Sequence, residues 1–199
     1  MTKDWTGNSN SIYKTLGASS HSDSDREIND YYATDLRDME LLLEQETFEN
    51  VWECACGGGH LAKVLDSHGI LARASDMYYK CYGEPDVDFF GVNSWNGDIV
   101  TNPPYKYAQE FIEHALAIIE TGRKVAMFLK VQFLEGKRRK LMFLQNPPKV
   151  IYVSISRLLC AKNGNFNNEK GVISSSSVAY AWYVWSKGYG GNTIVLWIN

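Results

Sequence analysis

The segment DIVTNPPY (98–105) constrains the fold of this chain more than any other. Ile99 and Val100 are typical of a buried strand, but the two prolines that follow have no backbone N–H and cannot continue a central strand. The strand must therefore end at the prolines, which places an amide and a phenol ring at its carboxyl end. In open α/β sheets, this is the end at which ligands bind.

Strand and helix patterns alternate on both sides of this segment. Apolar residues at a helical period predict helices at 35–45, 57–69, 107–122 and 135–146. Apolar runs predict the other strands, at 50–56, 71–77, 87–90, 124–134, 149–156, 177–188 and 193–199. Such alternation is typical of parallel βαβ units. The YGGN turn (189–192) between the last two strands predicts a hairpin. We therefore expect an α/β fold with a mostly parallel sheet of seven or eight strands and antiparallel C-terminal strands.

The composition is that of a soluble globular protein, with 45% of the 199 residues hydrophobic and 22% charged. No apolar run reaches the length of about 18 residues that crosses a membrane, and the N-terminal segment lacks the apolar core of a signal peptide. We expect a cytoplasmic protein with an N-terminal arm over residues 1–29 and one domain over residues 30–199. The net charge of −3 argues against strong sequence-independent binding to nucleic acid, but not against a local basic patch.

A glycine-rich turn follows the first predicted strand of the α/β region, in ECACGGGHLA (53–62). Glycines at such a turn let the backbone approach a ligand, and the N–H groups at the start of the next helix then face that ligand. The segment lacks the full dinucleotide fingerprint, because Leu61 and Ala62 stand where another glycine is expected. A tight strand–helix turn without a ligand is the alternative interpretation.

Two acidic positions follow the next strands. Asp76, with Met77 beside it, ends a predicted strand about 20 residues after Gly57, which is the spacing of the acid that binds ribose hydroxyls in nucleoside-binding folds. Asp88 and Phe89 could hold the amino edge and the face of an adenine. The alternatives are an acid that caps a turn at Asp76, and two core phenylalanines, Phe89 and Phe90, beside a solvated acid at Asp88.

The residues of NPPY suit chemistry on an amine that is conjugated to a ring. Such an amine is a poor nucleophile, and a site can help by accepting hydrogen bonds from both of its N–H groups. The Asn102 side-chain oxygen and the Pro103 carbonyl can supply these acceptors, held rigid by Pro104. Tyr105 offers a face on which the target ring can stack.

The order of ECACGGGHLA, Asp76 and NPPY resembles the amino-methyltransferases that use S-adenosylmethionine. The nearest resemblance is to DNA N6-adenine methyltransferases, particularly small phage- or prophage-type enzymes, and it covers roughly residues 30 to 199. It implies a Rossmann-like methyltransferase fold, S-adenosylmethionine as cofactor, and methyl transfer to the N6 amine of an adenine flipped out of DNA.

The resemblance also implies roles for individual residues. The methionine part of the cofactor would contact Glu53, Gly57 and Gly59, the ribose would bind Asp76, and the adenine would meet Asp88 and Phe89. The catalytic residues would be Asn102, Pro103, Pro104 and Tyr105. The segment DYYATDL (30–36) is similar to the family's aromatic-x-Thr-Pro segment, which implies that Tyr32 and Thr34 lie near the methionine end. This chain departs from the pattern in lacking that proline and in having Cys54 after the acid.

Partners and substrates are less constrained. A basic run, Lys137, Arg138, Arg139 and Lys140, follows a strand end on the expected rim of the site, where it could meet DNA phosphates or form a solvated face. The 94 residues after Tyr105 leave no room for a target-recognition domain. Specificity is then low, or comes from the arm, from loop 160–176, or from a specificity partner or homo-oligomer.

Other substrates and another class of function stay open. RNA and protein-glutamine methyltransferases share NPPY, so RNA adenine and protein glutamine are alternative substrates, and a non-catalytic cofactor-binding partner subunit is the alternative of another class. Cys54 and Cys56 lack the further ligands of a closed zinc site, so we expect no metal. The four cysteines show no framework spacing, which favours reduced thiols.

Overall fold

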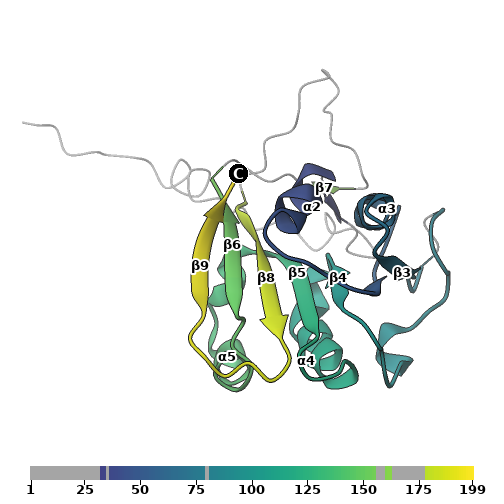
Figure 1. Ribbon diagram of the computed structural model, residues 1–199. Helices are drawn as coiled ribbons and strands as arrows, with labels where there is room; N and C mark the ends of the chain where they lie inside the picture. The colour runs from purple at the N-terminus through teal and green to yellow at the C-terminus, as the bar shows by residue number, and fades with distance from the viewer. Residues whose placement is uncertain (1–31, 35, 79–80, 156–159, 163–177) are drawn as a thin grey trace, which may run out of the picture.

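The computed structural model describes residues 32–34, 36–78, 81–155, 160–162 and 178–199 (Figure 1). The predicted N-terminal arm and most of the loop 160–176 lie outside these residues. A seven-stranded sheet forms the centre, in the order β3-β2-β4-β5-β8-β6-β9. Its strands are β2 (Val51–Glu53), β3 (Leu71–Ala74), β4 (Ile99–Thr101), β5 (Lys124–Lys130), β6 (Val150–Ser154), β8 (Tyr180–Ser186) and β9 (Ile194–Ile198).

Six of the seven strands run in one direction. The pairs β2–β3, β2–β4, β4–β5 and β6–β9 are parallel, whereas β8 is antiparallel to both of its neighbours, β5 and β6. The antiparallel part of the sheet is therefore β8. The predicted β8–β9 hairpin is wrong, because β6 lies between these two strands and pairs with both of them.

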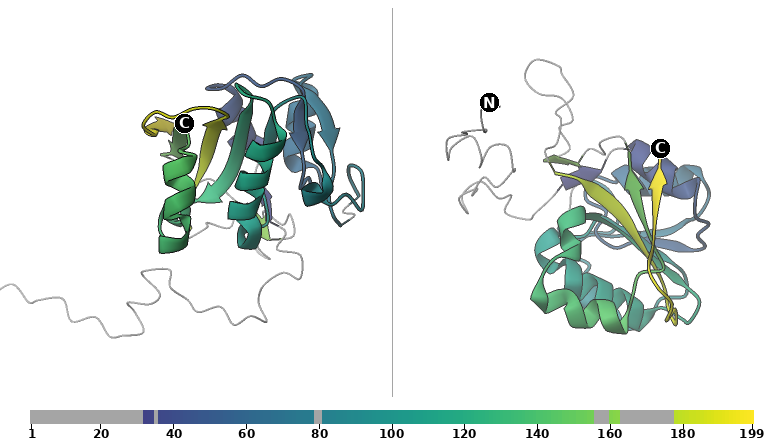
Figure 2. Two further views of the ribbon diagram at one scale, coloured as in Figure 1. Left: turned by 90° about the horizontal axis from the view of Figure 1, so that it is seen from below. Right: turned by 90° about the vertical axis from the view of Figure 1, so that its left-hand side faces the viewer.

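Helices cover both faces of the sheet. Helices α4 (Ala108–Ile118) and α5 (Lys140–Gln145) lie on one face, and α2 (Leu36–Leu43) and α3 (His60–Ser67) lie on the other (Figures 1 and 2). Each face has its own apolar cluster, one around Trp52 and Phe111 and the other around Leu42 and Phe128. Because both faces are buried, the central strands are continuous apolar runs, and all five residues from Val125 to Leu129 are buried.

The predicted strand at 87–90 is wrong. Phe89–Gly91 form a 3₁₀ turn, η2, and the Asp88 carboxylate accepts a hydrogen bond of 2.9 Å from the Phe90 N–H. A side chain that satisfies the local backbone in this way competes with strand pairing. The segment still contributes to the core, because the Phe89 ring stacks on Phe111 with 4.9 Å between centroids.

Asp98, at the start of DIVTNPPY, holds the amino end of β4. It is buried, and its two carboxylate oxygens accept hydrogen bonds of 2.7 Å each from the backbone N–H groups of Glu49 and Lys124. Glu49 lies just before β2, and Lys124 is the first residue of β5. The acid therefore aligns three neighbouring strands at the end of the sheet opposite Asn102.

A second, two-stranded sheet pairs β1 (Tyr32–Thr34) with β7 (Cys160–Lys162) in antiparallel orientation. Neither strand was predicted from the sequence. The β1 backbone lies close to α3. Within the described residues, no helix is long and apolar enough to span a membrane.

Candidate functional site

Three sequence motifs meet at the carboxyl ends of neighbouring strands. Strand β2 lies between β3 and β4, so the glycine turn after β2, Asp76 after β3 and NPPY after β4 belong to one edge of the sheet. Backbone hydrogen bonds fix the turn against β3: the Ser75 N–H donates to the Glu53 carbonyl at 2.9 Å, and the Cys56 N–H donates to the Ser75 carbonyl at 3.0 Å. The fold thus brings together residues separated by about 50 positions in the chain.

Asp76 connects the glycine turn to the end of β3. Its Oδ2 accepts a hydrogen bond of 2.8 Å from the Gly57 N–H, and its Oδ1 accepts one of 2.8 Å from the Tyr78 N–H. A carboxylate has about four lone-pair positions, and donors from the described residues use two of them, which leaves two for ligand hydroxyls within that part of the chain. Asp76 is half-buried and Met77 beside it is exposed, which leaves both accessible to a ligand.

The two predicted glycines both have positive φ, 51° at Gly57 and 78° at Gly59, which a residue with a Cβ adopts at a cost. At Gly59 there is a second requirement. A Cβ there would overlap the ring of Tyr82, which packs directly over the turn. The Lys63 ammonium group lies 5.3 Å from the centre of the same ring. Tyr82 is a candidate site residue that the sequence patterns did not indicate.

Glu53 is a buried acid at the end of β2, with 1% of its surface exposed. Its Oε1 accepts a hydrogen bond of 3.0 Å from the Thr101 hydroxyl of β4. Its Oε2 is buried and has no hydrogen-bond partner among the residues that the structure describes. Burial raises the pKa of Glu53 to about 8, and the negative charge of Asp76 adds to the increase, while the Thr101 hydroxyl and the Asn102 backbone oppose it.

The four residues of NPPY leave β4 and lead into α4. Asn102 is half-buried and its side-chain oxygen is buried. Pro104 precedes the 3₁₀ turn η3 (Tyr105–Tyr107), and its carbonyl accepts a hydrogen bond of 2.9 Å from the Tyr107 N–H. The prolines thus end the strand, as expected, and start the turn from which α4 continues.

The ring of Tyr105 is held on the rim of the sheet. It lies 5.9 Å from the Tyr180 ring of β8, and the ammonium group of Lys130, at the end of β5, lies 5.0 Å from its centre. A cation over an aromatic face is attracted by the ring quadrupole. Tyr105 and Lys130 therefore combine an aromatic surface and a positive charge next to Asn102.

Asp88 and Phe89, the predicted adenine-binding pair, have different environments. Asp88 is exposed, whereas Phe89 is 3% exposed and packs in the core between Trp52 and Phe111. This burial favours a packing role for Phe89 over direct contact with a ligand. Phe90, which was not predicted, is 41% exposed on the same turn.

The basic run divides into three exposed residues and one structural residue. Lys137, Arg138 and Lys140 are exposed. Arg139 is half-buried: it donates a hydrogen bond of 2.8 Å from Nε to the Phe133 carbonyl and another from Nη2 to the Glu135 carbonyl, and its guanidinium lies 4.7 Å from the centre of the Phe133 ring. Arg139 therefore closes the loop that follows β5, whereas the other three side chains face solvent.

The other residues that the sequence singled out are Tyr32, Thr34, Cys54 and Cys56. The side chains of Tyr32 and Thr34 lie outside the described part of the chain. Cys54 and Cys56 are buried, and burial raises the pKa of both thiols, that of Cys56 to about 12. Both are therefore protonated thiols at neutral pH. Across the described ranges, no group of three or more His, Cys, Asp or Glu side chains could hold a metal ion.

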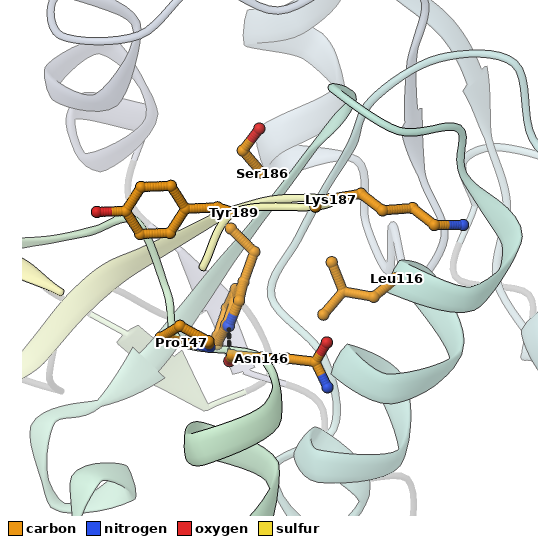
Figure 3. A pocket seen from close by; sticks show the side chains of 8 residues that line it. Leu116, Asn146, Pro147, Ser186, Lys187 and Tyr189 are labelled. Atoms are coloured by element: carbon orange, nitrogen blue, oxygen red, sulfur yellow. Dashed lines mark hydrogen bonds between the residues drawn. The ribbon is translucent and has the colours of Figure 1, made fainter. Parts of the chain in front are cut away.

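A small pocket lies at the opposite end of the sheet (Figure 3). Among the residues that line it are Asn146, Ser186 and Lys187. Ser186 ends β8 and pairs with Lys124, the first residue of β5, so the pocket is at the amino ends of the parallel strands. The Lys187 ammonium group donates to the carbonyls of Ala117 and Ile119 at the end of α4. The pocket is thus separate from the three motifs, and its lysine stabilises a helix end.

Solved structures of low sequence identity share this fold. A protein from Listeria monocytogenes, assigned as a class I S-adenosylmethionine-dependent methyltransferase, is 12% identical with a TM-score of 0.54 over 94% of this chain and 70% of its own. The M protein of the type I restriction enzyme EcoKI is 12% identical with a TM-score of 0.53 over 83% of this chain and 46% of its own. A protein from Lactococcus lactis, assigned as a hemolysin, is 13% identical with a TM-score of 0.51 over 81% of this chain and 91% of its own.

Identities of this size show a common fold and nothing more. The predicted Rossmann-like methyltransferase fold is thereby confirmed. The chain spans less than half of the EcoKI M protein. No protein-family model matches the sequence, and no curated protein matches it.

Proposed function

We propose that this chain is an S-adenosylmethionine-dependent methyltransferase that acts on the exocyclic N6 amine of adenine in DNA. The observation that carries the proposal is the meeting of the glycine turn, Asp76 and NPPY at the carboxyl ends of β2, β3 and β4. Ligands of open α/β sheets bind at this edge. A fold shared with a class I methyltransferase supports the same reaction class.

The residues of the turn fit the cofactor. Asp76 retains acceptor positions suited to ribose hydroxyls, and the backbone at Gly57 is close to it. The buried Oε2 of Glu53 has no partner among the described residues. The ammonium group of the methionine part, bound beside it, would lower the raised pKa of Glu53 and stabilise the carboxylate form. When bound, S-adenosylmethionine supplies an electrophilic methyl group.

The residues of NPPY prepare the target amine. The Asn102 side-chain oxygen and the Pro103 carbonyl accept hydrogen bonds from the two N–H groups of the amine. The lone pair of the nitrogen is then available for the methyl group. Because the Asn102 oxygen is buried, the Asn102 side chain or the residues that bury it must move slightly for this oxygen to reach the amine when substrate binds. Tyr105 holds the flipped base by stacking, and Lys130 beside it favours the adjacent phosphate.

Labelled cofactor and mass spectrometry test the proposal. The protein is incubated with methyl-labelled S-adenosylmethionine and with DNA, RNA or a glutamine-containing protein, and the products are hydrolysed and identified. We expect label in N6-methyladenine from DNA. Label in RNA adenine or in protein glutamine would show that RNA or protein, rather than DNA, is the substrate. Binding of cofactor without label in any product would support a non-catalytic partner subunit instead.

Asn102→Ala tests the catalytic motif in the same assay. Loss of one preorganised acceptor is expected to lower the methylation rate by about 10² to 10³ while cofactor affinity stays within about twofold. Glu113→Ala, on the exposed face of α4, is the matched control and should methylate at the wild-type rate. An undiminished rate for Asn102→Ala would mean that NPPY is structural and the proposal is wrong.

A further inference from the structure

Among the described residues, strand β9 forms an apolar edge of the sheet without a neighbour on its outer side. It is the last strand in the order and pairs only with β6 among the described strands. Figure 2, right, looks on to this edge, with β9 nearest the viewer. Four consecutive residues are exposed by 42 to 69%, namely Ile194, Val195, Leu196 and Trp197.

Both faces of β9 are apolar. Val195 and Trp197 are paired with Ile151 and Val153, which belong to the core on the α4 and α5 side. Leu196 is paired with Tyr152, which belongs to the core on the α2 and α3 side. A helix on one face would leave the other exposed, whereas another strand beside β9 would contact its side chains laterally on both faces and bond to its outward backbone groups.

The edge carries none of the features that normally prevent strand pairing. Exposed edge strands are usually protected by lysines, prolines or bulges. Residues 188–199 contain no charged side chain and no proline. Two such edges can therefore meet without repulsion between like charges, and an exposed tryptophan such as Trp197 is typical of the centre of an interface.

We propose that β9 pairs in antiparallel orientation with β9 of a second copy of this chain. The proposal does not depend on the proposed function. A symmetric dimer uses the same surface on both subunits, and a neutral, doubly apolar strand is complementary to itself. The two seven-stranded sheets would then form one continuous sheet across the dimer.

The backbone of β9 limits the registers that this pairing can adopt. The Ile194 N–H donates to the Lys149 carbonyl, and the Ile155 N–H donates to the Ile198 carbonyl, each at 3.2 Å. Residues 194 and 198 therefore bond inward to β6, and by the alternation of a strand the N–H and C=O groups of Val195 and Trp197 point outward.

The register that overlaps all five residues of both strands places the twofold axis beside Leu196, the central residue of β9. Val195 of one subunit forms a hydrogen-bonded pair with Trp197 of the other, in both directions, and Leu196 faces Leu196 as the non-hydrogen-bonded pair between them. Side chains in such a pair are close, with Cα atoms about 4.5 Å apart. In this register, Val195 and Trp197 of both subunits lie on one face of the joined sheet, and Leu196 of both subunits lies on the other.

A charge exchange at Leu196 tests the proposal by sedimentation equilibrium. Wild-type protein should be a dimer, and Leu196→Lys and Leu196→Glu should each raise the dimer dissociation constant at least about tenfold, because like charges directly opposite each other are destabilising. An equal mixture of the two variants should restore the dimer. Ala72→Lys is the control: this exposed residue lies on β3, at the other end of the strand order, and the dimer should persist.

Hydrogen exchange on the wild-type protein gives an independent readout that requires no variant to fold. The amides of Val195 and Trp197 should be protected at high concentration and lose that protection on dilution. A wild-type monomer at all concentrations would overturn the proposal. Dimers that survive both charge variants, or fail to re-form in the mixture, would overturn the register at Leu196.

Discussion

The Thr101 hydroxyl donates a hydrogen bond of 3.0 Å to Oε1 of Glu53, and this bond connects the two halves of the candidate site. Glu53 ends the strand that leads into the glycine turn, and Thr101 immediately precedes Asn102. Both side chains are buried. The residue before NPPY is therefore bonded to the acid that precedes the glycine turn.

Glu53→Gln should change how stability depends on pH. Burial raises the pKa of Glu53 from its ordinary value of 4.5 to about 8. Between these values the folded protein keeps a proton that the unfolded chain loses, so the free energy of unfolding of the wild type should fall as pH rises through this window. Glutamine keeps an acceptor for Thr101 and does not titrate.

Urea unfolding at about pH 5.5 and at about pH 8.5 measures the effect. The difference in free energy of unfolding between the two pH values should be smaller in Glu53→Gln than in the wild type. Glu113→Gln, at an exposed position on α4, serves as the control for removing one carboxylate. The same pH dependence in Glu53→Gln and in the wild type would show that Glu53 is not a buried protonated acid.

Gly59→Ala should destabilise the protein more than Gly69→Ala. Both glycines have positive φ, 78° and 69°, so both substitutions introduce backbone strain of about 1–2 kcal/mol. Only at Gly59 would the new methyl group meet another side chain, the ring of Tyr82, whereas the space around Gly69 is open. We expect an additional cost of about 1–3 kcal/mol at Gly59, in the range of overpacked sites.

A double-mutant cycle separates the two causes. Tyr82→Ala should remove most of the additional cost of Gly59→Ala and none of the cost of Gly69→Ala, as measured by urea unfolding. If Tyr82→Ala and Gly59→Ala are additive, the ring does not restrict position 59. In that case the glycine is required by its backbone conformation alone.

The sheet was predictable from the sequence, because strands buried on both faces are continuous apolar runs and the prolines after Asn102 fix one strand end. The sequence did not reveal which strands are neighbours: the YGGN turn was interpreted as a hairpin, yet β6 separates β8 from β9. Strand pairing depends on tertiary contacts that no local pattern encodes. The packing of Tyr82 on Gly59 was missed for the same reason, since a glycine pattern does not identify the residue that packs on it.

Residue types were also insufficient to separate functional from structural roles within a motif. Asp88 and Phe89 are adjacent, but the first is exposed and the second is in the core, because the 3₁₀ turn directs them differently. Asp98 and Asn102 lie in one short segment, but at opposite ends of β4. In each case the burial of the side chain, rather than its identity, indicates what it can contact.

Within the basic run, three residues should contribute to DNA binding and Arg139 should contribute to stability. Neutralising Lys137, Arg138 and Lys140 together should weaken DNA binding and reduce the slope of log affinity against log salt by about 0.9 for each DNA phosphate that these side chains neutralise in the wild type. Arg139→Ala should instead lower the free energy of unfolding, because it removes hydrogen bonds to the Phe133 and Glu135 carbonyls. Fluorescence anisotropy at several salt concentrations and urea unfolding measure the two effects, and an unaltered salt slope in the triple variant would assign these side chains to a solvated surface.

Asp76→Ala should weaken cofactor binding without affecting the opposite end of the sheet. The variant would lack the carboxylate and its charge-assisted hydrogen bonds to ribose, each worth about 1.5–3 kcal/mol. Affinity for the cofactor should therefore fall at least about tenfold. Because Asp76 also accepts hydrogen bonds from the Gly57 and Tyr78 N–H groups, some stability is lost as well. Calorimetry with S-adenosylmethionine at a temperature where the variant is folded separates the effects, and Glu84→Ala, an exposed acid near the end of β3, is the control. Unchanged affinity in Asp76→Ala would remove this residue from the cofactor site.

Tyr105 should act through its ring rather than its hydroxyl. Tyr105→Ala should weaken binding of DNA that carries a mismatched, easily flipped target adenine by about 1–3 kcal/mol, the usual value of one base–aromatic stack. Tyr105→Phe keeps the face that lies near Lys130 and Tyr180, so its affinity should stay close to that of the wild type. Tyr107→Ala, at an exposed tyrosine on the same turn, is the matched control for loss of an aromatic side chain. A loss in Tyr105→Phe as large as in Tyr105→Ala would assign the role to the hydroxyl, and equal affinities for all three variants would exclude Tyr105 as the surface on which the flipped base stacks.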